Sequence, residues 1–204
     1  RILDFKRNNY LCKILSTSQI KDYSSNIVLD AITLINNKKV EKKLFGKAIP
    51  LLDPIHYLLN NYNTGIHRNN LLPSNYNFNT TSKINDMNNM AYIDIFFSYI
   101  ASEITIHNKN PSFPIYYGSL TGIGEYIHDI SDDIDEFKYH KGFNKQFNKS
   151  FILKSFTSYD NTYSNDSFQS NTSSTSTSSS SNSDIEDIIS IFKNFPISYL
   201  FIEK

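Results

Sequence analysis

One long helical pattern constrains the fold of this chain more than any other feature. Between Asp86 and Asn110, apolar residues recur at three- and four-residue spacing, which places them on one face of a helix. The residues of this predicted face are Met90, Ile93, Phe97, Ile100 and Ile104. Pro111 follows, and because the residue before a proline disfavours the helical conformation, we expect the helix to end there.

Strand patterns flank this helix on both sides. Apolar, partly alternating runs predict strands over residues 10–16, 27–35, 43–50, 113–119 and 197–203. Two short helices are also expected, one beginning at Asp53-Pro54 and one over residues 184–192. The order is therefore three strands, one major helix and two strands, which makes the predicted fold class α+β.

Two polar segments interrupt these elements. Residues 60–85 are rich in Asn and lack periodicity, which predicts a surface excursion. Residues 124–183 are interpreted as a low-complexity insertion, because the tract 164–183 is nearly pure Ser, Thr and Asn and buries too little apolar area to offset its ordering entropy. We therefore expect a first part over 1–123, a largely disordered insertion over 124–183, and a last helix and strand over 184–204.

Charge and composition argue against several classes of function. The chain has 204 residues with 20 basic and 20 acidic side chains, whereas nucleic-acid binding relies on clustered positive charge. The apolar run 91–101 contains Asp94 and is too short to span a bilayer. The histidines show no paired ligand spacing, and the single Cys12 gives no zinc motif. We expect no nucleic-acid partner, no membrane partner and no metal site, and the oligomeric state stays open.

Three charged residues stand in a fixed order on the predicted elements. Lys47 lies on the third strand, Glu103 lies late in the long helix, and Glu203 ends the last strand. By spacing alone, each also fits an ordinary exposed charge, which is the commonest fate of Lys and Glu. Asp94 lies too early in the helix to take the place of Glu103.

This order of strand lysine, helix glutamate and strand-end glutamate resembles the small lobe of protein kinases. Three segments are most similar in sequence to the serine/threonine protein kinases of giant viruses of the mimivirus type. These segments are Gly46–Pro54, Asn110–Gly118 and Tyr199–Glu203. The resemblance implies a five-stranded antiparallel sheet with one major helix between its third and fourth strands. Residues 60–85 and 124–183 would be insertions in that lobe.

The resemblance also implies roles for single residues. Lys47 would hold the α- and β-phosphates of ATP, and Glu103 would pair with it. Val28 would pack on the adenine, and Ile202 would be the gatekeeper at the back of the nucleotide pocket. The backbone of Glu203 would open the hinge that reads the adenine edge.

The phosphate-covering turn and the catalytic motifs depart from the family pattern. Kinases use glycines in this turn so that backbone amides approach the phosphates, whereas residues 21–26 contain none. Ser24 and Ser25 are expected to supply hydrogen bonds instead. The His-Arg-Asp and Asp-Phe-Gly motifs are absent, so magnesium binding and phosphoryl transfer would require a large lobe after Lys204.

Alternative functions therefore remain open. The first is the ATP-binding small lobe of a viral serine/threonine kinase, which would transfer the γ-phosphate to a protein substrate only if a large lobe follows. The second is a non-catalytic kinase-like or structural interaction protein of a large DNA virus. Both place the protein in the host cytoplasm or the virion. An unrelated α+β domain, in which Lys47 and Glu103 do not approach each other, is a third alternative.

Overall fold

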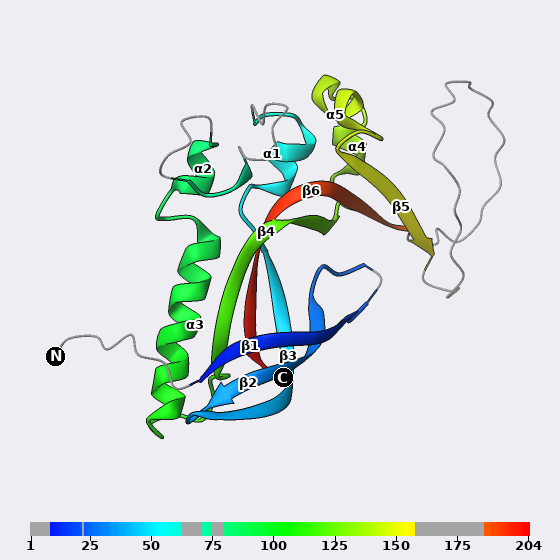
Figure 1. The fold of residues 1–204 in the computed structure, drawn as a ribbon. Coiled ribbons are helices and arrows are strands. Elements are labelled where there is room, and N and C mark those ends of the chain that lie inside the picture. Colours follow the sequence, from blue (N-terminus) through cyan, green and yellow to red (C-terminus); the bar gives the residue numbers. More distant parts are fainter. Residues whose placement is uncertain (1–8, 22, 63–70, 75–79, 158–185) are drawn as a thin grey trace.

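A computed structural model describes residues 9–21, 23–62, 71–74, 80–157 and 186–204 (Figure 1). These residues form an α+β fold with one curled antiparallel sheet and few helices. The predicted fold class and the antiparallel sheet are confirmed. The Asn-rich residues 63–70 and 75–79 and the tract 158–183 lie outside the described residues.

The sheet has the strand order β1-β2-β3-β6-β4, and each strand is antiparallel to its neighbours. The bounds are β1 Asn9–Gln19, β2 Ile27–Ile35, β3 Lys38–Pro50, β4 Tyr116–Asp129 and β6 Glu186–Glu203. A two-residue turn, Asn36-Asn37, joins β2 to β3 with both residues at positive φ. Asn tolerates this conformation better than most residues, which explains why the hairpin closes here.

Strand β6 is much longer than the sequence predicted, because the expected helix over 184–192 is wrong. Residues 186–192 of β6 pair with β5 (Phe151–Thr157), and residues 197–203 pair with β3, while β4 accompanies both halves. Ile189, Ile191 and Phe192 are all buried. A short apolar run buried on both faces has no periodicity that separates helix from strand, and Ile favours a strand.

The insertion expected over residues 124–183 is structured through residue 157. It contains the second half of β4, the helices α4 (Ile134–Phe137) and α5 (Lys141–Gln146), and β5. These elements gather at the end of the β4–β6 ribbon that extends beyond β3 (Figure 1). Phe137, Phe143 and Phe151 are buried there, so this segment buries enough apolar area to be ordered.

The long helix α3 spans Met90–Ile106 and begins four residues later than predicted. Asn89 caps it by accepting a hydrogen bond from the Ala91 amide, and its side-chain amide donates to the carbonyls of Leu51 and Lys83. The predicted apolar face was wrong. Met90 and Phe97 are 66% and 63% exposed, whereas the buried positions are Ala91, Tyr99 and Ser102.

The small residues of α3 explain which of its faces packs. Nearly every face of this helix carries apolar side chains, so hydrophobicity alone did not decide its orientation. Ser102 lets the backbone of α3 approach β4 closely, because its hydroxyl accepts a hydrogen bond from the Tyr116 amide, and Ala91 is buried in the helix-side core. The shorter helices are α1 (Pro54–Leu58), which starts at Asp53-Pro54 as predicted, and α2 (Ser82–Asn85).

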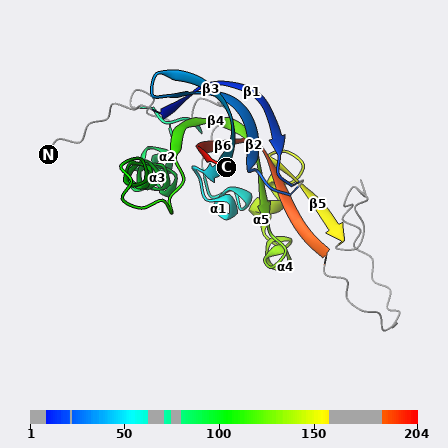
Figure 2. The same ribbon diagram turned by 90° about the horizontal axis from the view of Figure 1, so that it is seen from below.

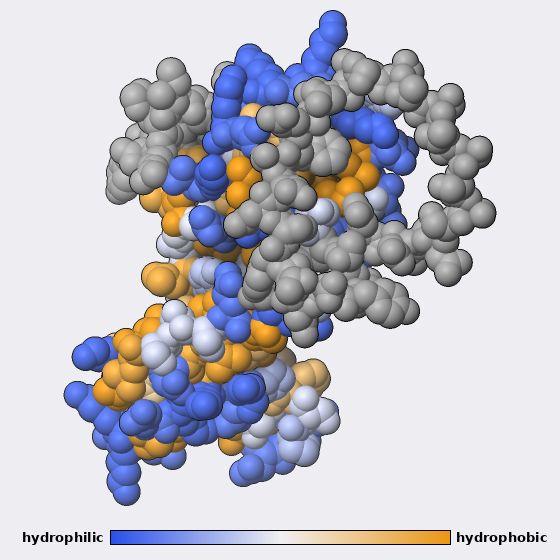
Figure 3. Space-filling view, turned by 90° about the vertical axis from the view of Figure 1, so that its right-hand side faces the viewer, coloured by the Kyte–Doolittle hydropathy of each residue, from blue (hydrophilic) through white to orange (hydrophobic). Residues whose placement is uncertain are grey.

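Two cores lie on opposite faces of the sheet. Cross-strand partners share a face, so Lys47, Ile49 and Leu200 define a helix side, against which α1 and α3 lie (Figure 2). Leu44 and Phe201 define a far side, where a smaller cluster lies inside the curl of the sheet. Apolar side chains also gather at the waist between the part with β1, β2 and β3 and the part with α4, α5 and β5 (Figure 3).

Two glycines are required by close packing. A Cβ on Gly46 would lie 2.6 Å from Cγ1 of Ile27 on the far side of β3. A Cβ on Gly142 would overlap the carbonyl oxygen of Leu59, at the point where α5 meets the end of α1. A side chain at Gly142 would require the backbone to move, whereas one at Gly46 would require the Ile27 side chain to move.

Candidate functional site

Strand β3 and helix α3 bring a lysine and a carboxylate together on the helix side of the sheet. Lys47 Nζ lies 2.6 Å from Asp94 Oδ2, and the two side chains are 46% and 39% exposed. A pair this exposed stabilises a fold by at most about 1 kcal/mol. Because both side chains are partly exposed, both groups are accessible to solvent and to a ligand.

The predicted partner Glu103 is not in this pair. Its carboxylate lies 3.7 Å from Nε2 of His107, on the following turn of α3. Nine residues separate Glu103 from Asp94, which places them about 180° apart around the helix and about 13 Å apart along it. The predicted Lys47–Glu103 pair is therefore wrong, and Asp94, which the spacing argument excluded, takes its place.

Three half-buried side chains form a row across the sheet beside Lys47. Val28, Phe45 and Ile202 are cross-strand partners on β2, β3 and β6, and this row lies on the helix side because Phe45 is two residues before Lys47. The sequence analysis named Val28 and Ile202 but missed Phe45. Side chains two residues apart on a strand share a face, and this signal in the sequence could have placed Phe45 beside Lys47.

The turn that precedes β2 is held against β4 and β6. The Ser24 hydroxyl accepts from the Asn26 amide at 3.2 Å, and the Ser25 hydroxyl accepts from the Ile127 amide at 2.6 Å. The Tyr199 hydroxyl donates to the Ser25 carbonyl at 3.4 Å. Tyr199 lies on the far side, opposite Lys47, because Ala48 is its cross-strand partner. The structure therefore does not group Ser24 and Ser25 with Lys47.

Glu203 also lies on the far side, in a cluster of its own. Lys42 Nζ lies 2.6 Å from Glu203 Oε1 and donates to the Tyr117 hydroxyl at 3.2 Å. The Glu203 carboxylate raises the pKa of Lys42 above its ordinary value of 10.5, against the opposing effect of burial. The Glu203 amide donates to the carbonyl of Ile115 at 2.9 Å, so this backbone donor is already in use. Among the predicted site residues, the structure thus groups Lys47, Val28 and Ile202 on one face and separates Glu103, Ser24, Ser25 and Glu203 from them.

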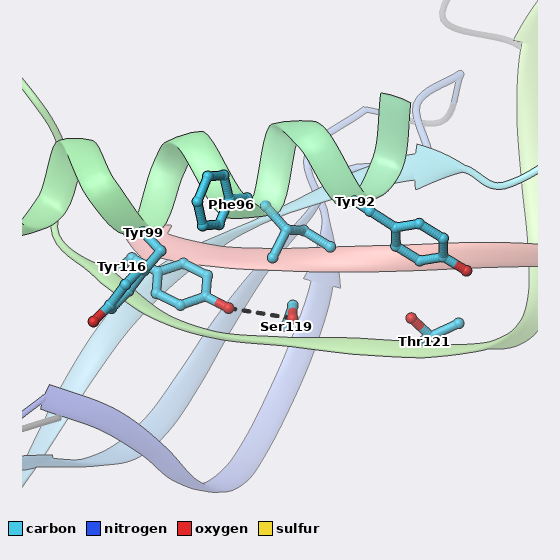
Figure 4. A pocket seen from close by; sticks show the side chains of 7 residues that line it. Tyr92, Phe96, Tyr99, Tyr116, Ser119 and Thr121 are labelled. Carbon is cyan, nitrogen blue, oxygen red and sulfur yellow. Dashed lines mark hydrogen bonds between the residues drawn. The ribbon is translucent and has the colours of Figure 1, made fainter. Parts of the chain in front are cut away.

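A cavity of about 460 Å³ opens between α3 and β4 (Figure 4). Its lining comprises Tyr92, Ile95, Phe96, Tyr99, Tyr116, Ser119 and Thr121. Tyr99 and Tyr116 meet edge to face at one end, with ring centroids 6.0 Å apart. The sequence analysis missed this cavity, because the residues that line it from α3 lie off the apolar stripe on which the helix was predicted.

The described residues contain no group of three or more His, Cys, Asp or Glu side chains placed to hold a metal ion. Within the same residues, no helix is long and apolar enough to cross a membrane.

The comparisons with known proteins leave the family open. No family model matches the chain, and no curated protein matches it. No solved structure matches it either. The functional argument therefore rests on the geometry of the site.

Proposed function

We propose that the chain is the ATP-binding small lobe of a serine/threonine protein kinase of the giant-virus type. Lys47 would hold the α- and β-phosphates, and Asp94 rather than Glu103 would orient it. Val28, Phe45 and Ile202 would supply the apolar surface for the adenine. Transfer of the γ-phosphate to a protein substrate, and magnesium binding, would require a large lobe.

The observation that carries this proposal is the Lys47–Asp94 pair. A strand lysine held by an acidic residue of α3 is close to the arrangement that the resemblance implies, although this residue is Asp94 and not the later Glu103. The order of elements supports it as well, because three antiparallel strands precede α3 and two long strands follow it. A cation rooted on a rigid strand, with a counter-ion that fixes its direction, suits a polyanionic phosphate group.

Equilibrium dialysis of radiolabelled ATP against the chain tests the proposal. Lys47→Met should weaken ATP binding by at least about tenfold, which corresponds to the loss of about 1.4 kcal/mol. Lys43→Met is the matched control, because Lys43 is exposed on the same strand and the same face and should leave binding unchanged. Equal losses in the two variants would contradict the role of Lys47.

Asp94 and Glu103 offer a second contrast in the same assay. Asp94→Asn should weaken ATP binding, because Lys47 loses the group that orients it, whereas Glu103→Gln should have no effect. The reverse result would restore Glu103 to the role that the sequence suggested.

A non-catalytic interaction protein is the second candidate, and the turn before β2 favours it. This turn has no glycine, and Ser25 ties it to the Ile127 amide on β4. A chain that binds no ATP, while folding cooperatively, would favour this second candidate and an unrelated α+β domain over the kinase lobe.

A further inference from the structure

We propose that the cavity between α3 and β4 binds a small, neutral aromatic compound that carries a hydrogen-bonding edge, the chemistry of an indole or a phenol. This site is distinct from the proposed nucleotide site and does not depend on it. The proposal rests on the shape of the cavity, its hydroxyl groups and the uncharged side chains that line it among the described residues.

Aromatic rings form the ends of the cavity. Tyr92 stands at one end and Tyr99 with Tyr116 at the other, while Phe96 borders it from α3 (Figure 4). Rings of this kind prefer to stack on, or meet edge to face, another flat ring. A volume of about 460 Å³ lies within the range of small-molecule sites and has room for a bicyclic ring.

Hydroxyl groups on β4 supply the polar part of the lining. Thr121 Oγ1 lies 2.7 Å from Ser198 Oγ, and the Tyr116 hydroxyl lies 3.2 Å from Ser119 Oγ. A hydroxyl has one donor and two acceptor sites, so one bond leaves Ser119 and Thr121 with capacity for a ligand. The lining can therefore accept from a ring N–H or O–H and donate to a ring oxygen.

Among the described residues, the lining contains no Lys, Arg, Asp, Glu or His. Burial also raises the pKa of Tyr92 above its ordinary value, so this phenol stays neutral at neutral pH. A charged ligand would gain no counter-ion from these side chains. The cavity therefore favours a neutral ring.

The cavity and the Lys47–Asp94 pair lie on different sides of α3. Tyr92, Phe96 and Tyr99 project between about 140° and 200° around the helix from Asp94, by their sequence spacing. Asp94 reaches Lys47 on β3, whereas the cavity residues lie over β4. Nucleotide and aromatic ligand should therefore occupy separate places.

The probe is N-acetyltryptophanamide, a neutral indole. The chain contains no tryptophan, so indole fluorescence reports on the probe alone. We expect saturable binding with a blue-shifted emission, and the probe should stay bound when ATP is added. Lys47→Met should leave its affinity unchanged, so this test remains informative even if the chain binds no nucleotide. Displacement by ATP would assign the probe to the nucleotide site and overturn the proposal.

Two adjacent phenylalanines give the matched variants. Phe96 lines the cavity and Phe97 does not, although both are exposed on α3, at 49% and 63%. Phe96→Ala should weaken probe binding by about fivefold to tenfold, as expected for the loss of one aromatic contact, and Phe97→Ala should not. No saturable binding to the native chain, or equal affinities in the two variants, would overturn the proposal.

The polar edge has its own test. Thr121→Val keeps the shape of the side chain and removes the hydroxyl, and a probe methylated at the indole nitrogen removes the donor from the ligand. Each change should weaken binding by about threefold to tenfold. If neither change alters the affinity, the cavity binds rings without a polar contact, and the proposed ligand chemistry is wrong. Thermal unfolding of each variant verifies that it is folded.

Discussion

Within the described residues, strand β3 carries one ion pair on each of its faces, and the two pairs are built differently. Lys47 meets Asp94 from a separate helix, and no further hydrogen bond or ion pair joins these two groups among the described side chains. Lys42 meets Glu203 from β6 and also lies 5.7 Å from the centre of the Tyr117 ring, so that this cluster ties three strands together. The far-side pair is therefore held by more contacts than the helix-side pair, although its side chains are 31% and 38% exposed.

The largest expected effect compares neighbouring residues on the two faces of β6. Phe201 is 2% exposed in the far-side cluster, whereas Ile202 is half-buried on the helix side. Phe201→Ala should lower the free energy of unfolding by about 3–5 kcal/mol through the loss of buried area and the cavity left behind. Ile202→Ala should cost clearly less, about 1–2 kcal/mol. Urea unfolding measures both, and equal losses would remove the distinction between the faces.

The next effect compares the two lysines themselves. Lys42→Met should lower the free energy of unfolding by about 1 kcal/mol, because Glu203 and Tyr117 both lose a hydrogen-bond donor. Lys47→Met should change it by no more than about 0.5 kcal/mol, as for most exposed pairs. A larger loss in Lys47→Met than in Lys42→Met would reverse the roles of the two faces.

A smaller effect separates the two carboxylates of α3. In a double-mutant cycle, Lys47→Met and Asp94→Asn should show a coupling energy of about 0.5 kcal/mol. The parallel cycle with Glu103→Gln should show none, because that carboxylate faces His107. Raising the salt concentration should reduce the first coupling toward zero. A coupling that appears only with Glu103 would contradict the geometry of α3.

The smallest effect comes from His128, on β4 and away from both ion pairs. Burial lowers the pKa of its imidazole below the ordinary 6.5, although Asp129, Asp53 and Asp133 oppose the shift. The folded chain therefore binds this proton less readily than the unfolded chain. The associated stability is fully present above pH 6.5 and falls as the pH drops from 6.5 toward the folded pKa.

His128→Gln isolates that contribution. Urea unfolding at about pH 7.5 and about pH 5.5 should show a smaller loss on acidification for this variant than for the native chain. The lowered pKa of Asp129, caused by hydrogen bonds from Ser131, acts at lower pH and does not interfere. An unchanged difference between the two pH values would show that His128 does not carry it.

Local sequence patterns predicted the helices and strands better than they predicted the contacts between them. The alternation of residues 27–35 gave β2 with its observed bounds, and Asp53-Pro54 gave the start of α1. Residues 184–192 were predicted to form a helix. A short apolar segment fits the helical period and the strand period equally well until its neighbours in the fold are known. The elements at 130–157 were missed because the polar tract that follows them dominated the composition.

The candidate site shows the same division. Lys47, Val28 and Ile202 were named from the sequence and lie on one face of the sheet. Asp94 was excluded because it lies early in the helix. No local signal tells which side of an apolar helix will pack, so the sequence did not reveal that Asp94 meets Lys47. Only the packing of Ser102 against β4 and of Ala91 in the helix-side core turns Asp94 toward Lys47 and Glu103 away from it.

The sequence by itself determined the α+β class, the order of β1, β2, β3 and α3, and the place of Lys47 on β3. These follow from periodicity and turn chemistry, which act over a few residues. The tertiary structure alone decided the partner of that lysine, the separation of Glu203 onto the far side, and the cavity between α3 and β4. Those features depend on how the helix rotates against the sheet, and close packing between distant segments fixes that rotation.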